Sequence, residues 1–128
     1  MQRLSLLSLL VTDYDDGISF YVGTLGFELF EDTDLGDGKR WVRVGPAGAE
    51  TGFLIAKAVG DQAKAIGNQG GGRVWLFLET DDFAGDHQRM TEAGVAFEEE
   101  PRKEPYGTVA VFRDPFGNRW DLIEYQNA

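Results

Sequence analysis

Three kinds of side chain in this sequence could do chemistry: carboxylates, arginines and one histidine. A carboxylate that burial keeps from water can act as a general base, and Asp121 with Arg43 as its electrostatic partner is the candidate pair. The only histidine, His87, falls on the apolar stripe of a predicted helix, so we expect a structural role for it. The chain has no cysteine, which excludes disulfides, thiolate metal ligands and a cysteine nucleophile.

The net charge of −10 limits the partners that the chain can bind. A phosphate backbone would be repelled, so we expect no nucleic-acid partner. Acidity of this size keeps a protein soluble, and it also favours cationic ligands. No segment is long enough to predict a membrane span, and the apolar run near the N-terminus is interpreted as a strand. The absence of cysteine is compatible with a reducing compartment, and since neither a signal segment nor a membrane span is predicted, the cytoplasm is the expected location.

The elements that must position these side chains follow one order in the first half of the chain. A strand is followed by a helix, which Asp15 or Asp16 is predicted to cap and Gly26 to end. The predicted apolar face of this helix consists of Ile18, Tyr21, Val22 and Leu25. The predicted strands cover residues 4–11, 27–30, 40–44 and 52–56, and residues 34–38 are predicted to form a turn.

The second half repeats this order. Asp81 and Asp82 are predicted to cap a helix that Gly94 ends, and the predicted strands cover residues 74–79, 95–98, 108–113 and 119–124. Residues 98–105 are predicted to form a strand end and a loop. Asp13 and Asp81 are as far apart in the sequence as Gly26 and Gly94, which indicates a tandem repeat. We therefore predict one α+β domain over 1–128, with βαβββ modules at 1–56 and 73–128 joined by a linker at 57–72.

The motifs Val11-Thr-Asp13, Phe20-Tyr21 and Leu25-Gly-Phe27, together with the closing segment Phe112–Glu124, resemble those of the vicinal oxygen chelate superfamily. This group includes glyoxalase I, bleomycin-resistance proteins and extradiol dioxygenases, and the chain is most similar to an uncharacterised glyoxalase-like branch. The resemblance implies a cupped, eight-stranded mixed sheet with helices outside. It also implies a homodimer whose cleft often borrows residues from the partner.

The same resemblance implies four metal-ligand positions, usually His, Glu or Gln, two from each module. Here the first position is Leu6, its repeat equivalent is Val74, and the third falls within 52–54, where the residues are Gly, Phe and Leu. The last position matches Asp121. One carboxylate does not hold a divalent cation against water, so we predict no metal and no cofactor.

Side chains alternate along a strand, which predicts the lining of the cleft. If Leu6 and Val74 face it, then Ser8 and Leu76 do so too, whereas Phe77 packs under the helices. The full predicted set is Leu6, Ser8, Trp41, Arg43, Val74, Leu76, Arg119 and Asp121. Trp41 either stacks on a ligand or packs in the core. Asp121 either forms an ion pair with Arg43 or Arg119, or acts as a base.

Three functions are compatible with such a cleft. The preferred one is metal-independent binding or sequestration of a small, partly apolar molecule, similar to bleomycin resistance. The second is an enzyme: a glyoxalase-type lyase or dioxygenase with a non-standard metal site built from Asp121, Glu124 or Glu79, or a metal-free acid–base enzyme using Asp121. The third is a structural or regulatory module that acts through dimerisation, with a cleft filled by Trp41 and Leu76.

Overall fold

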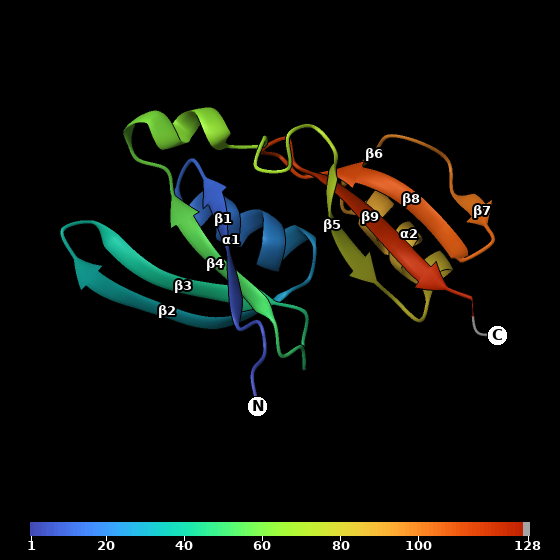
Figure 1. Ribbon diagram of the computed structural model, residues 1–128, viewed down its shortest axis with the longest axis horizontal. Helices are drawn as coiled ribbons and strands as arrows, with labels where there is room; N and C mark the ends of the chain where they lie inside the picture. The colour runs from blue at the N-terminus through green and yellow to red at the C-terminus, as the bar shows by residue number, and fades with distance from the viewer. Residues whose placement is uncertain (127–128) are drawn as a thin grey trace. The chain divides into compact units, whose positions relative to one another are not determined.

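The computed structural model describes residues 1–126, which form two compact units, Met1–Ile66 and a second that begins at Gly67 (Figure 1). Each unit contains a mixed sheet with a helix on one face, and the order of elements in the second unit repeats that of the first with one additional strand. The predicted α+β class and the tandem arrangement of two modules are therefore confirmed.

The first unit is built on a four-stranded sheet in the order β1-β4-β3-β2. β1 runs parallel to β4, and the other neighbouring strands are antiparallel. The elements are β1 (Leu6–Val11), α1 (Tyr14–Ile18), η1 (a π-helical stretch, Ser19–Thr24), β2 (Glu28–Gly36), β3 (Lys39–Gly45), β4 (Gly52–Lys57) and η2 (a 3-10 helix, Gly60–Ala65).

The start of α1 differs from the prediction. Asp13, rather than Asp15 or Asp16, is the N-cap, and its side chain accepts a hydrogen bond of 2.9 Å from the amide of Tyr14. The π-helical stretch then rotates the buried face relative to an ideal α-helix. Of the predicted apolar face, Tyr21 and Leu25 are buried, whereas Ile18 and Val22 are half-buried; Tyr14 and Phe20 are buried as well.

The second unit contains a five-stranded sheet in the order β5-β9-β8-β6, with β7 also paired to β8. Its elements are β5 (Val74–Glu79), α2 (Phe83–Glu92), β6 (Ala96–Phe97), β7 (Arg102–Glu104), β8 (Gly107–Arg113) and β9 (Arg119–Tyr125). The strand predicted over 95–98 is shorter than expected, and β7 lies in a segment that was predicted to be a loop. The described residues therefore form nine strands in two sheets, where eight strands were expected.

Each helix packs on one face of its own sheet. In the first unit Gly17 of α1 lies so close to Val11 and Ile55 that an added Cβ would be 2.9 Å from the Ile55 side chain. In the second unit a chain of ring contacts runs from Phe83 and His87 of α2 through Phe97 and Phe112 to Trp120 of β9. His87 is thus packed between aromatic rings, which agrees with a structural role. We call the sheet face that points away from the unit's own helix the distal face.

None of the helices in the described part of the chain is both long and apolar enough to cross a membrane.

A buried carboxylate holds the turn between β8 and β9. Asp114 is 4% exposed and accepts four hydrogen bonds, each 3.0 Å long. The donors are the amides of Phe116 and Asn118, the Asn118 side-chain amide and the Trp120 indole. This network fixes the position at which β9 begins, and β9 carries Arg119 and Asp121.

We predict that Asp114→Ala lowers the free energy of unfolding by about 3 kcal/mol, because four donors lose their acceptor in a buried place. Urea denaturation would measure the loss. Asp34→Ala is the matched control, since Asp34 is exposed and accepts a hydrogen bond from only one backbone amide, that of Gly36. We expect it to cost less than about 0.5 kcal/mol. Equal effects of the two substitutions would contradict the conclusion that Asp114 stabilises the turn between β8 and β9.

Candidate functional site

The distal face of the first unit carries the residues that the alternation predicted. Ser8 of β1 pairs with Leu54 of β4, and Leu54 pairs with Arg43 of β3, so the three side chains lie in one row. The adjacent row, which contains Ile55 and Val42, packs toward α1. Leu6 and Trp41 share the distal face with Ser8 and Arg43 because they are two residues away along the same strands.

Arg43 is held by neighbours within its own unit. Its Nε donates to a carboxylate oxygen of Glu31 at 3.1 Å, and its guanidinium lies 5.9 Å from the centre of the Phe30 ring. Glu31 is also the cross-strand partner of Arg43. Within its own unit, Arg43 is thus paired with Glu31, a partner that the sequence did not predict.

The second unit corrects one prediction. A β-bulge between Val74 and Leu76 shifts the pairing of β5 with β9, so that Leu76 lies opposite Trp120 and Phe77 lies opposite Asp121. Leu76, predicted to line the cleft, therefore points to the α2 side and is 8% exposed. Phe77, predicted to pack under the helix, is on the distal face and 61% exposed.

Val74 precedes the bulge, pairs with Arg119 and keeps its predicted place on the distal face. The position of Phe77 on the distal face could not be predicted from the sequence. The run Val74–Glu79 is apolar at nearly every position, so it contains no period that would reveal a bulge. Because Leu76 lies on the other face, it does not fill the distal face together with Trp41, an arrangement that would have favoured a structural or regulatory module.

Asp121 is the most unusual group on this face. It is 8% exposed, and among residues 1–126 its Oδ1 atom has no hydrogen-bond partner. Its cross-strand neighbours, Val111 and Phe77, are hydrocarbon. Burial raises the pKa of the Asp121 carboxyl, an effect that nearby Arg102 and Arg119 oppose and Glu99 reinforces.

The arginines near Asp121 are bound to other carboxylates. Arg119 donates to Glu98 at 2.9 and 3.0 Å, and Glu98 also accepts from Arg113. Arg102 bridges Glu99 and Glu104, with 2.6 Å to each. The predicted ion pair between Asp121 and Arg119 is therefore wrong, and the charge of Asp121 has no direct counterion within the described residues.

The donor set does not fit the metal that the resemblance implies. Leu6 and Val74 offer hydrocarbon, the segment 52–54 offers no ligating side chain, and only Asp121 supplies an oxygen. Glu124 cannot join Asp121, because it lies on the α2 side, where it accepts a hydrogen bond of 2.7 Å from the amide of Phe83. In the part of the chain that the structure describes, no three His, Asp or Glu side chains gather as metal ligands would.

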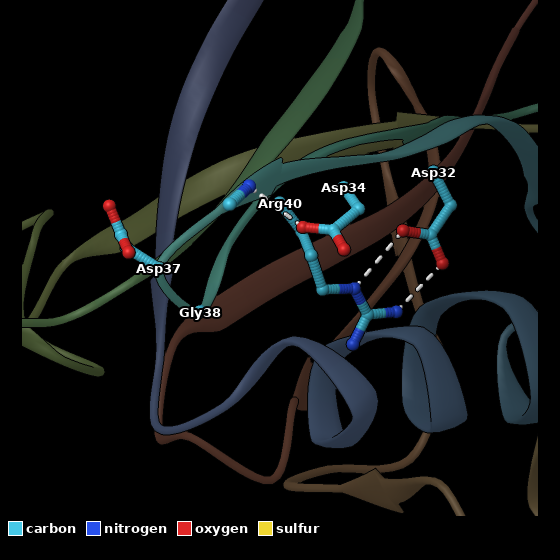
Figure 2. Close-up of a pocket in the computed structure, with 6 residues that line it drawn as sticks. Asp32, Asp34, Asp37, Gly38 and Arg40 are labelled. Atoms are coloured by element: carbon cyan, nitrogen blue, oxygen red, sulfur yellow. Dashed lines mark hydrogen bonds and ion pairs between the residues drawn. The ribbon is translucent and has the colours of Figure 1, made fainter.

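A hollow of about 410 Å³ lies at the tip of the β2–β3 hairpin, and Figure 2 shows its acidic residues. The Asp32 carboxylate is bound by Arg40 at 2.7 and 3.1 Å, and Arg40 also reaches Asp15 at 2.8 Å. Asp34 accepts from the amide of Gly36, while Asp37 points away from the Arg40 pair. These carboxylates stabilise a hairpin and do not converge on one point.

Known proteins of one superfamily are similar to this chain over nearly its whole length. The model of the "Glyoxalase/Bleomycin resistance protein/Dioxygenase superfamily" matches residues 3–122. An uncharacterised protein of Shewanella frigidimarina is 48% identical, over 96% of this chain and 93% of its own. The crystal structure of UcmS2 has a TM-score of 0.82 at 32% identity, covering 96% of this chain and 98% of that one. TnmS3, described as an antibiotic binding protein from Streptomyces sp. CB03234, has a TM-score of 0.80 at 32% identity, covering 98% of each chain.

The raised pKa of Asp121 predicts how stability changes with pH. A carboxyl whose pKa is higher in the folded state favours folding at low pH, and this contribution is lost as the pH rises through the raised pKa. Asp121→Asn is a neutral mimic of the protonated form. We expect the variant to be more stable than the parent by about 1 kcal/mol at about pH 7, with no difference at about pH 3.

Urea denaturation at the two pH values tests this expectation. Glu92→Gln is the control, because it removes one charge from an exposed position on α2. A lower stability of Asp121→Asn at neutral pH would show that the carboxylate has a stabilising partner, contrary to the geometry described above.

Proposed function

Because the chain belongs to the glyoxalase/bleomycin resistance protein/dioxygenase superfamily, we propose that it binds and sequesters a small, partly apolar molecule without a metal ion. The superfamily fold alone does not select a reaction, since one scaffold can host unrelated activities. The choice among them depends on the side chains that this chain presents.

One observation carries the proposal: three of the four positions expected to hold metal ligands carry no ligating side chain, and a lone buried carboxylate occupies the fourth. Exposed aromatic rings, Trp41 and Phe77, stand on the distal faces of the two sheets. Hydrocarbon with a few polar groups is the usual composition of small-molecule sites, where the polar groups fix orientation. Aromatic rings add stacking surface.

The similarity to TnmS3 supports a binding role, because that protein is described as an antibiotic binding protein. By extension, an aromatic antibiotic or a related toxic compound is the candidate ligand. We further propose that the binder is a homodimer, as the superfamily resemblance implies. An exposed ring such as Phe77 would be covered by a second copy or by the ligand.

A second candidate function is metal-free acid–base catalysis by Asp121. It is favoured by the raised pKa of a carboxyl whose Oδ1 atom has no hydrogen-bond partner within the described residues. The two functions differ in the effect of Asp121→Asn, which would abolish turnover in an enzyme while preserving binding of the substrate.

The metal-independent proposal predicts that Mn²⁺, Ni²⁺, Zn²⁺ and Fe²⁺ each change the melting temperature by less than about 1 °C, since a specific site would stabilise the folded state by mass action. Elemental analysis of the purified protein, before and after chelation, completes the measurement. Asp121→Ala is the matched variant. Near-stoichiometric metal, or a clear upward shift that Asp121→Ala removes, would instead identify a metalloenzyme with unusual ligands.

The binding role predicts that aromatic antibiotics, tested as a panel that includes bleomycin, raise the melting temperature of the protein. For a compound that does so, Phe77→Ala should weaken binding about fivefold to tenfold, because one ring contact is lost. Leu35→Ala is the control, since Leu35 is similarly exposed but lies on the β2–β3 hairpin. An equal loss in both variants would contradict a site that includes Phe77.

A further inference from the structure

We propose that Asp121 is the recognition group for a cationic nitrogen, such as an ammonium or an amidinium, carried on an apolar aromatic body. This inference rests on the proposed small-molecule function and specifies the class of ligand. It uses three features of the second unit. These are the Asp121 oxygen that accepts no hydrogen bond from residues 1–126, the ion pairs that engage the neighbouring arginines, and the exposed ring of Phe77.

The first feature is the missing donor. Asp121 is about nine-tenths buried, and Oδ1 accepts no hydrogen bond from residues 1–126. A buried acceptor without a donor costs about 1–3 kcal/mol, and more when it is charged. A ligand that brings an N–H group to this carboxylate would recover that cost, so the binding energy is greatest for a donor that is also positively charged.

The second feature is the charge balance around Asp121. The charged groups that act on it are Arg102, Arg119 and Glu99. Arg102 is bound by Glu99 and Glu104, while Arg119 and Arg113 share Glu98. Three guanidinium groups thus meet three glutamates, and the charge of Asp121 is left over. An anionic ligand would have to break one of these pairs, whereas a cation completes the balance.

The third feature is the position of Phe77. Its ring is 61% exposed, and it is the cross-strand partner of Asp121 on the same face. Neighbouring strands lie about 4.8 Å apart, which places a carboxylate and an aromatic face within the reach of one small ligand. A cation bound by Asp121 would also be attracted by the negative face of the ring. The apolar body of the ligand can stack on the same ring.

The test uses three probes that share one ring system: 1-naphthylmethylamine, 1-naphthylmethanol and 1-naphthoate. Calorimetric titration of the full chain should show the ammonium probe binding about tenfold more tightly than the alcohol, with naphthoate weakest. In Asp121→Asn this preference should fall to about threefold or less, while the alcohol binds as before. Glu92→Gln, which removes a remote charge, should retain the full preference.

A second measurement does not depend on a variant. Addition of 1-naphthylmethylamine to the parent protein should shift the backbone amide NMR signals of Phe77, Val111 and Asp121. Shifts confined to other parts of the chain would overturn the assignment of Asp121. So would a preference for the ammonium that persists in Asp121→Asn.

The remaining outcomes separate this inference from the proposed function. Equal binding of the three probes with shifts at Phe77 would leave the small-molecule function intact and overturn the cationic preference. Absence of binding by all three at millimolar concentration would overturn both.

Discussion

The geometry of the second unit depends on the hydrogen bonds that the buried Asp114 carboxylate accepts. Its four hydrogen bonds close the turn between β8 and β9 and bind the Trp120 indole from within β9. The register of β9 then determines which side chains reach each face: Trp120 and Leu122 pack toward α2, and Asp121 points to the distal face. A shift of one residue would exchange these two sets.

The two buried aspartates of this hairpin, Asp114 and Asp121, therefore differ in how well their carboxylates are hydrogen-bonded. The Asp114 carboxylate accepts hydrogen bonds from two backbone amides and two side chains, so its burial stabilises the fold. Asp121 is almost equally buried, but its Oδ1 atom accepts no hydrogen bond from residues 1–126 and lies next to the hydrocarbon side chains of Val111 and Phe77. Folding alone gives no reason to keep a carboxylate there. A group that is unfavourable for the folded state is the kind of feature that a ligand would explain.

Much of the fold could be predicted from the sequence, because both halves of the chain show the same order of strands, helix-capping aspartates and terminal glycines. Each half therefore supports the prediction made for the other. The faces of β1 and β3 followed from simple alternation, because Leu9 and Val11 on β1 and Val42 and Val44 on β3 are buried on one side. The face of β5 did not, because its residues are apolar on both sides and a bulge reverses the alternation after Val74. The partners of Arg43 and Arg119 were also missed, since Glu31 and Glu98 come from neighbouring strands or loops whose register the sequence does not give.

The tandem repeat makes the single carboxylate more informative. Leu6 and Val74 occupy equivalent positions in the two units and are both hydrocarbon, so this pair retains the symmetry of the repeat. Asp121 breaks that symmetry, because its equivalent segment at 52–54 has no ionisable side chain. In the binding role proposed above, the same residue that is too isolated to hold a metal ion is sufficient to orient a ligand on the face of the second unit.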